Sequence, residues 1–466
     1  MRRLTGTHVY SYVKCPRLAA LDLHVPRSER RAMHPWEEFA ARRGREFEAT
    51  YVAGLAAVAP SYPERDFEAG AAATLELLQR GVPLVHQAVL LDGDRLGLPD
   101  LLRKVPGDSR LGAHHYEVVD VKTSGRPRSD QILQVVFYAD LLAAVQGRWP
   151  ERGGIVLKDG REQTFAIADY TAAQREVVDE LRRLRDQPDR ARAFLQAGCA
   201  SCHHDQRCLP ELQQRQDLSL VHGMSHGALA ILEQRGCRTV TDLATFHAEG
   251  ARARGNLDPT LLRRLRRAAQ ARLLGRPIVE ARPRAALGDA ALVHLLADPF
   301  ADRVLAFGVL HPAREDGAFA WAAAAAAADE WRVFRELVLA LPPRVPLLHF
   351  GDALPRWYAE HAFAREADPA LEARFVDVGK RLRTAAIYPA PVFGLADLVR
   401  HGLDRDPLRA GHAGAAAMWT AEPDGHERLG AKLRADLLDL AALKAVILDA
   451  APSEPLAAES DAGAQA

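Results

Sequence analysis

The sequence predicts an α/β protein made of several domains. Short apolar runs alternate with segments of helical periodicity, and turns rich in Gly, Asp and Pro separate them. The 466 residues exceed what one hydrophobic core usually supports. With 48% apolar and 26% charged residues, the composition is that of an ordinary globular protein. We expect three domains and a tail, with bounds 1–212, 213–284, 285–450 and 451–466.

The first domain alternates helices and strands. A 3–4 apolar period predicts helices at 36–57, 66–80, 129–146 and 171–196. Apolar runs predict strands at 84–91 and 116–122, and “GGIVLKDG” with “REQTFAIAD” predicts a hairpin. Ser129 or Asp130 is a natural N-cap for the helix at 129–146. This order of elements is typical of an α/β domain.

The second domain is expected to be small and helical. “LVHGMSHGALAILEQRGCRTVTDLATF” predicts two short helices joined at Gly236-Cys237 and a further helix start at Thr241. It resembles a helix-hairpin-helix unit, with the usual paired glycines half present because Gly223 is followed by Ser225. Between residues 252 and 284 the chain carries ten arginines against two acids. A solvated helix face and a surface that binds DNA phosphates both remain open.

The third domain begins with strand-like runs. “ALVHLLAD”, “RVLAFGVLH” and “VPLLHFGD” predict strands that are followed by helical stretches, which favours another α/β unit. The Ala-rich tract Ala320–Asp329 is expected to belong to a helix, and the small polar residues 451–466 to be disordered. No apolar run reaches the ~18–20 residues of a membrane helix, and the basic start lacks a signal-peptide core. We expect a cytoplasmic protein without membrane contact.

Lysine is rare in this chain, which makes Lys122 conspicuous. Only seven of the 61 basic residues are lysine. On a strand Asp120 and Lys122 share one face, while Val119 and Val121 point into the core. With Asp100 from a neighbouring strand, the two carboxylates would suit Mg²⁺ or Mn²⁺, which phosphodiester hydrolysis uses. A plain Asp120–Lys122 salt bridge is the alternative.

A composite pattern extends this interpretation. It consists of Gly97-x-x-Asp100, Asp120-x-Lys122 and Gln134-x-x-x-Tyr138. The pattern resembles the RecB-type nucleases of the PD-(D/E)xK superfamily, which have a restriction-endonuclease-like core. The resemblance implies that Asp100 and Asp120 bind a catalytic metal and that Lys122 positions the attacking water. It also implies that Gln134 and Tyr138, one helical turn apart, contact the active site or DNA.

Two positions depart from that family's pattern. A helix of the family carries Gly followed four residues later by His, whereas here Gly44 is followed by Glu48. Glu48 can still ligate a divalent ion, or it can be a solvent-facing helix charge. Many relatives also have a glutamate before the Gly-x-x-Asp turn, where this chain has Gln87. A neutral amide is a poorer Mg²⁺ ligand, so one metal is expected rather than two.

The cysteines predict a second, structural centre. Four of them are candidate ligands: Cys15, Cys199, Cys202 and Cys208. Four thiolates can bind zinc or an iron–sulfur cluster. Their arrangement resembles the CRISPR-associated four-cysteine nucleases and AddB-type nuclease domains, which implies a [4Fe–4S] cluster that staples the chain termini of the nuclease domain. Zinc, with His203 and His204 as substitute ligands, is the alternative, and Cys237 is expected to be a buried apolar residue.

The third domain resembles RNase H-like, DnaQ-type exonuclease domains. Their opening Asp-x-Glu pair falls here on His294 and Leu296. Asp377 and Asp439 resemble later acids of that fold, and the tyrosine expected before the last acid is Ala435. Loss of the first pair removes the centre of a two-metal site. We therefore expect a folded but inactive domain, with Asp377 and Asp439 as caps or surface charges.

Together these patterns predict a metal-dependent DNA nuclease with a [4Fe–4S] staple, acting as an exonuclease on single-stranded ends by resemblance. DNA is the expected partner, although the global net charge of zero does not by itself indicate nucleic-acid binding. A non-catalytic nucleic-acid-binding scaffold that retains the fold is the alternative.

Overall fold

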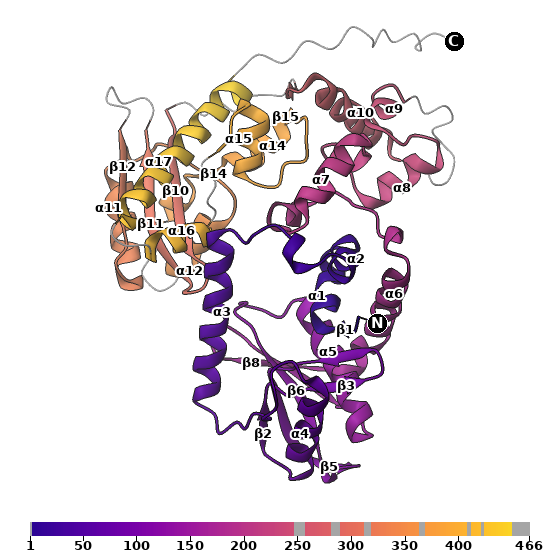
Figure 1. Ribbon diagram of the computed structural model, residues 1–466. Helices are drawn as coiled ribbons and strands as arrows, with labels where there is room; N and C mark the ends of the chain where they lie inside the picture. Colours follow the sequence, from indigo (N-terminus) through magenta and orange to yellow (C-terminus); the bar gives the residue numbers. More distant parts are fainter. Residues whose placement is uncertain are drawn as a thin grey trace. The chain divides into compact units, whose positions relative to one another are not determined.

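The computed structural model describes residues 2–246, 257–280, 289–311, 318–362, 369–407, 412–420 and 424–449 (Figure 1). The chain forms two compact units. Unit 1 comprises Met1–Ala193 and Ala200–Gln206, and unit 2 comprises Phe194–Cys199 and Arg207–Ala466. Both mix helices and strands, which confirms the α/β class. Among the described helices none is long and apolar enough to cross a membrane. The tail expected to be disordered, 451–466, lies outside the described residues.

Unit 1 is built on a five-stranded sheet of order β2-β5-β6-β7-β8, with a separate three-stranded sheet of order β1-β4-β3. Its strands are β1 Leu4–Thr5, β2 Leu84–His86, β3 Leu90–Asp92, β4 Arg95–Gly97, β5 Leu101–Ser109, β6 Gly112–Val121, β7 Arg152–Val156 and β8 Glu162–Ala166. Its helices are α1 Gly6–Lys14, α2 Pro16–His24, α3 Pro35–Ala53, α4 Phe67–Gln79, α5 Ser129–Gln146 and α6 Thr171–Asp186. The predicted hairpin is confirmed, since β7 and β8 pair antiparallel.

The centre of unit 1 is the β6–α5–β7 crossover. Strands β6 and β7 are parallel, so the chain must cross over between them, and α5 is that connection. The helix predicted at 129–146 has these bounds in the structure, but Arg128 is its N-cap and Ser129 already lies within the helix. The side chains of α5 that pack into the core include Val135, Phe137 and Leu141.

Two predicted boundaries in unit 1 are wrong for local reasons. The strand expected at 84–91 is divided into β2 and β3, because Gln87 adopts a left-handed backbone with φ of 51° that no regular strand accommodates. The helix expected at 171–196 ends at Asp186. Gln187, which precedes Pro188, has φ −140° and ψ 77°, and a residue before proline disfavours the helical region.

Unit 2 contains a helical module. Helix α7 spans Asp205–Gln214 across the boundary between the units, and α8 His226–Gln234, α9 Val240–Ala244 and α10 Pro259–Leu274 follow. Helices α8 and α9 flank the predicted joint, where Gly236 has φ of 81°. Cys237 is buried in the module's core, as expected. Of the arginine-rich segment, residues 252–256 and 281–284 lie outside the described residues.

The rest of unit 2 has a mixed five-stranded sheet of order β12-β11-β10-β13-β14. The strands are β10 Ala291–Asp298, β11 Arg303–Leu310, β12 Phe319–Ala323, β13 Leu347–His349 and β14 Phe375–Asp377, and β9 Ile278–Val279 pairs separately with β15 Ala386–Ile387. The helices are α11 Glu330–Leu339, α12 Ala353–Ala362, α13 Pro369–Glu372, α14 Val378–Ala385, α15 Leu395–Leu403, α16 His412–Thr420 and α17 Gly425–Leu443. The three predicted strands are confirmed.

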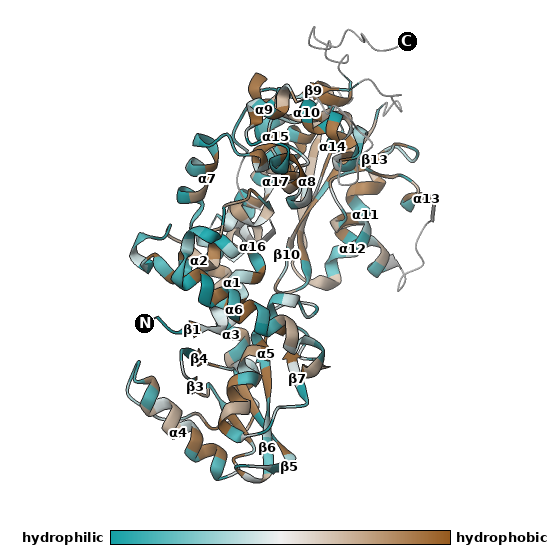
Figure 2. Ribbon diagram, turned by 90° about the vertical axis from the view of Figure 1, so that its right-hand side faces the viewer, coloured by the Kyte–Doolittle hydropathy of each residue, from teal (hydrophilic) through white to brown (hydrophobic). Residues whose placement is uncertain are grey.

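Alternation along β10 produces two cores on opposite faces of this sheet. Val293 and Leu295 pack with residues of α11 and α12, whereas Leu292 belongs to a core with residues of α14, α15 and α17. Figure 2 shows the hydrophobic character of β10. The helix expected in the Ala-rich tract is wrong, because Phe319–Ala323 forms edge strand β12, paired with β11. Cross-strand pairing thus overrides the helical propensity of alanine.

Candidate active site

Strand pairing brings Asp100 and Asp120 together. Asp100 directly precedes β5, and Asp120 is the penultimate residue of β6. Because Leu101 is paired with Val119, the next pair outward is Asp100 and Asp120. The carboxylate Oδ2 of Asp100 also accepts a hydrogen bond of 2.8 Å from the backbone N–H of Val121. Two segments twenty residues apart therefore meet at one end of the sheet.

Lys122 completes this group. Its Nζ lies 2.6 Å from Oδ2 of Asp120 and 3.6 Å from Oδ2 of Asp100. The Asp120 side chain is 1% exposed and that of Lys122 is 23% exposed. Val119 and Val121 pack into a small core on the opposite face, as the strand period predicts. The structure thus contains the Asp120–Lys122 ion pair, but within a three-residue group rather than alone.

The carboxylate pair perturbs the ionisation of its neighbours. Burial raises the pKa of Asp100 well above its usual range, and the negative charge of Asp120 raises it further. Burial would lower the pKa of Lys122, but Asp120 and Asp100 together outweigh it and raise that pKa. Lys122 is therefore an ammonium group at neutral pH.

The donor set fits a divalent cation. Oδ2 of Asp120 is buried and makes no hydrogen bond of regular geometry within the described residues, although the Lys122 ammonium lies beside it. Two close carboxylates, one with a raised pKa, form a site where a positive charge relieves mutual repulsion. Hard oxygen ligands are those that Mg²⁺ and Mn²⁺ prefer. Asp100 and Asp120 are the residues that would hold such an ion.

Glu48 of α3 belongs to the same neighbourhood, and its negative charge also raises the pKa of Asp100. Its Oε1 accepts a 2.6 Å hydrogen bond from Nε2 of Gln87 and lies 3.3 Å from Nε2 of His86. Glu48 is therefore not a solvated helix charge, and a role as a third metal ligand stays a prediction. Gln87 adopts its left-handed conformation beside this group, and its backbone N–H donates to the carbonyl of Asp100.

Gln134 and Tyr138 meet on one face of α5, as their spacing predicts. Nε2 of Gln134 donates a 2.9 Å hydrogen bond to the Tyr138 hydroxyl. Burial raises the pKa of Tyr138, and the charge of Asp120 adds to this effect. Gly6 leaves room for its ring, since a Cβ there would clash with it, and a Cβ at Gly97 would clash with the neighbouring Leu141. The role of Gly6 was missed, because nothing in the sequence links α1 to this site.

The four candidate cluster ligands are divided between the two units. Cys15 and Cys202 belong to unit 1, whereas Cys199 and Cys208 belong to unit 2. Cys15 lies at the joint between α1 and α2, and Cys208 lies in α7. The four-cysteine centre, with ligands from both units, stays a prediction.

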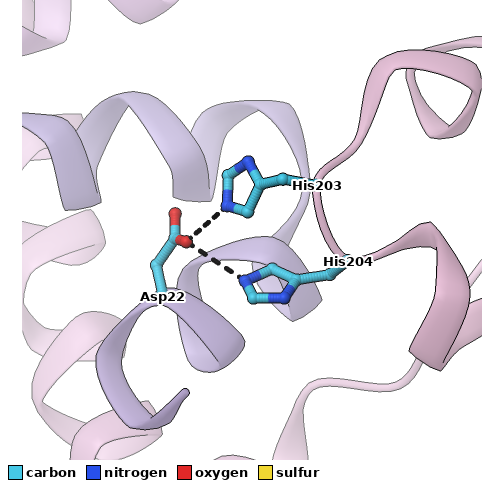
Figure 3. A group of neighbouring side chains, drawn as sticks. All are labelled: Asp22, His203 and His204. Carbon is cyan, nitrogen blue, oxygen red and sulfur yellow. Dashed lines mark hydrogen bonds and ion pairs between the residues drawn. The ribbon is translucent and has the colours of Figure 1, made fainter. Parts of the chain in front are cut away.

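The segment that carries Cys202 is attached to the N-terminal helices through Asp22 of α2. Figure 3 shows His203 and His204 directed toward this carboxylate. Their Nε2 atoms lie 2.7 and 3.2 Å from Oδ1 of Asp22. Burial would raise the pKa of Asp22, but the hydrogen bonds from His203 and His204 lower it below its usual range.

These three side chains could also hold a metal ion. A guanidinium nitrogen of Arg30 lies 3.0 Å from Oδ1 of Asp22, and Ser11 donates to its Oδ2 at 2.8 Å. A cation thus already compensates the carboxylate, which favours a structural clamp over a metal site. The clamp joins residues 181 positions apart in the sequence.

In the third domain, His294 stands where the family has its first metal-binding acid, and it belongs to a buried charged group. His294 on β10 faces Asp436 on α17, with 3.3 Å between Nε2 and Oδ2. The Lys432 ammonium lies 2.6 Å from Oδ2 of the same aspartate, and both side chains are 6% exposed. Sequence reasoning missed Asp436, although a Lys and an Asp four residues apart on an apolar helix were a usable signal.

The two acids that the sequence singled out in this domain lie elsewhere. Asp377 is the N-cap of α14 and accepts a hydrogen bond from the backbone N–H of Lys380, as expected for a cap. Asp439 forms an ion pair with Arg405. Within the described residues, Asp436 is the carboxylate that His294 contacts, and the ammonium of Lys432 compensates its charge.

No family model matches the chain, and no curated protein matches it either. The resemblance to RecB-type nucleases rests on the motif residues and stays a prediction.

The raised pKa of Asp100 gives a test of metal binding that does not need activity. Without metal, the raised pKa means that protonated Asp100 stabilises the folded state. This contribution is fully present below the unfolded pKa of about 3.9, and it is lost as the pH rises through the raised pKa of the folded state. At pH 7, Mn²⁺ at about 100 times its Kd should restore about 2.7 kcal/mol. We expect a higher Tm with Mn²⁺ than with EDTA, and a smaller difference at pH 5.

Differential scanning fluorimetry of three proteins checks this result. Asp100→Asn should stabilise the metal-free protein at pH 7 and abolish the Mn²⁺ shift. Asp108→Asn, at an exposed position of the same strand, should behave as the unaltered protein. An equal Mn²⁺ shift in Asp100→Asn would place the metal elsewhere.

Proposed function

We propose that the protein is a divalent-metal-dependent nuclease that hydrolyses phosphodiester bonds in DNA. The observation that carries this proposal is the buried group of Asp100, Asp120 and Lys122 at one end of the five-stranded sheet. Buried carboxylates are expensive unless a cation compensates them, so such a pair is a candidate functional site. Asp100 and Asp120 would hold the metal. When bound, it supplies Lewis acidity at the phosphoryl oxygen and activates a water.

Lys122 has the complementary role in this proposal. Its raised pKa keeps the proton on Nζ, so it acts as a hydrogen-bond donor rather than as a base. From its place beside both carboxylates it can orient a water and offset negative charge that develops on the phosphate. Gln134 and Tyr138 hold each other in place nearby and would position the substrate strand.

We also propose that the protein contains a [4Fe–4S] cluster, held by Cys15, Cys199, Cys202 and Cys208. The Asp22 clamp supports this part of the proposal, because it fixes the segment next to Cys202 against helix α2. A cluster would close a long loop of chain in addition, and its effect would be structural. An anaerobically purified protein should be brown, whereas a zinc protein would be colourless.

A non-catalytic scaffold is the second candidate. The buried Lys432–Asp436 pair favours it for the third domain, since an ammonium there compensates the carboxylate without a metal. The same argument does not favour a scaffold for unit 1, where a single ammonium, that of Lys122, faces two carboxylates within the part of the chain that the structure describes.

The proposal predicts metal-dependent cleavage that requires Asp120. End-labelled single-stranded DNA, duplex DNA and RNA are incubated with the anaerobic protein in Mg²⁺, Mn²⁺ or EDTA. We expect cleavage of DNA with either metal and none with EDTA. Asp120→Asn should lose activity by about 10²–10³-fold or more, since the site loses a metal ligand.

Asp108→Asn serves as the matched control and should keep full activity. Preferred cleavage of RNA would change the proposed substrate. DNA binding without cleavage in any metal would support the scaffold instead.

A further inference from the structure

A cavity of about 430 Å³ lies within unit 2, whereas the residues proposed for catalysis belong to unit 1. Parts of α7, α9, α10 and α15 line it, together with the loop after β15. Its size falls in the range of small-molecule sites. Leu220 and Pro389 contribute apolar wall, and Gln213, Gln216 and Arg272 contribute polar groups.

Arg272 is the principal charge in this cavity. It lies in the last turn of α10, and one guanidinium nitrogen donates a 3.2 Å hydrogen bond to the carbonyl of Pro389. Burial lowers the pKa of Arg272, and no carboxylate opposes that effect. Within the described residues no acidic side chain forms an ion pair with it, unlike Arg267 of the same helix, which lies 3.6 Å from Glu280. A half-buried guanidinium without a counter-charge favours an anionic ligand.

His401 of α15 extends the polar wall. Burial lowers its pKa, and the nearby charge of Arg272 lowers it further, so the imidazole is neutral at pH 7 and can donate one hydrogen bond. Asp397 is the acid that acts on His401 in the opposite sense. The Asp397 carboxylate accepts hydrogen bonds from two backbone N–H groups and pairs with Arg400, so it does not neutralise the cavity.

Two exposed glutamines, Gln213 and Gln216, also line the cavity. Oε1 of Gln216 accepts a 2.8 Å hydrogen bond from the Thr241 hydroxyl, which leaves its amide N–H groups as the donors for a ligand. Gln213 is also exposed. The cavity therefore combines a guanidinium, an imidazole and amide donors with an apolar wall, and it has no acidic lining residue.

We propose that this cavity binds a phosphate monoester, with the phosphate on Arg272 and the organic part against Leu220 and Pro389. The guanidinium fork matches phosphate oxygens in pairs. The ligand is either a small molecule or the phosphorylated end of a nucleic-acid strand, since both present the same chemical group. The inference does not depend on the proposed nuclease activity.

Calorimetric titration of the full chain in EDTA tests the proposal, with adenosine 5′-monophosphate and adenosine as probes. We expect saturable binding of the monophosphate and at least tenfold weaker binding of adenosine. Arg272→Gln should weaken monophosphate binding at least tenfold, and Arg272→Lys should retain part of it. Arg263→Gln, on an exposed position of the same helix, should leave it unchanged. Circular dichroism establishes that each variant is folded.

A second titration distinguishes the sources of the phosphate. Oligonucleotides with a 5′-phosphate and with a 5′-hydroxyl are compared in the same variants. Arg272-dependent binding of the phosphorylated strand identifies a strand end, and binding of the monophosphate alone identifies a small molecule. Equal binding of adenosine and its monophosphate, no saturable binding of any phosphate probe, or equal losses in Arg272→Gln and Arg263→Gln would overturn the inference. All titrations are done in EDTA, which removes the metal that the proposed nuclease needs. Phosphate binding is therefore measured independently of cleavage, and the two proposals fail separately.

Discussion

Lys122→Ala is expected to lower the rate of metal-dependent DNA cleavage by about 10²–10³-fold, the usual effect of removing one donor from a developing negative charge. Nζ of Lys122 is 2.6 Å from Asp120 and 3.6 Å from Asp100, so it lies beside the carboxylates that would hold the metal and, through the metal, the phosphate. Single-turnover cleavage of end-labelled DNA at saturating Mn²⁺ measures the effect. Lys122→Arg should not restore the rate, because the bulkier guanidinium changes the geometry.

Lys104→Ala is the matched control for this experiment. Lys104 is an exposed lysine of β5 whose ammonium donates only to the backbone carbonyl of Gly81 among its hydrogen bonds within the described residues, so its loss should leave cleavage unchanged. Mn²⁺ should still raise the Tm of Lys122→Ala, which separates a loss of chemistry from a loss of metal. Full activity of Lys122→Ala would reduce the residue to a structural counter-ion.

Lys432→Ala is expected to lower the free energy of unfolding of unit 2 by about 3–5 kcal/mol, because it leaves a buried carboxylate without its cation. Lys432 and Asp436 are both buried, and His294 is a second neighbour of the aspartate. Burial would raise the pKa of Asp436, but His294 and Lys432 lower it below the usual value. The stabilisation is therefore present above about pH 3.9 and is lost as the pH falls further.

Chemical denaturation at pH 7 of three variants checks the size and origin of this effect. Lys444→Ala removes a partly exposed ion pair with Asp449 at the end of the same region and should cost about 0–1 kcal/mol. The double variant Lys432→Met with Asp436→Leu should recover most of the loss, since an apolar pair replaces a buried ion pair at little cost. A Lys432→Ala variant as stable as Lys444→Ala would contradict a buried, compensated carboxylate.

Local pattern was sufficient for much of the fold and for the centre of the candidate site. The helix at 129–146 and several strands, among them β6, β10 and β11, follow from hydrophobic periodicity, because burial of one face is a local property of a segment. Asp120 and Lys122 share a face for the same reason. Their approach to Asp100 needed one further inference, that two neighbouring strands pair, and sequential strands usually do.

Tertiary structure decided the remainder. Gln87 divides an apolar run that reads as one strand, since its left-handed backbone serves contacts with Glu48 and Asp100. The first residues of the Ala-rich tract, 320–323, became part of edge strand β12 because β11 offered an unpaired edge. In both cases long-range packing outweighed local preference.

The sequence by itself thus determined the α/β class, the positions of several helices and strands, and the residues that form the Asp100–Asp120–Lys122 group. It could not show that Asp22 holds His203 and His204, that Lys432 compensates Asp436 beside His294, or that Arg272 lines a cavity without a counter-charge. The physical reason is the same in each case. A charge acquires its partner, its burial and hence its pKa from other segments of the chain, 181 residues away for Asp22 and His203, and only the folded chain brings those segments together.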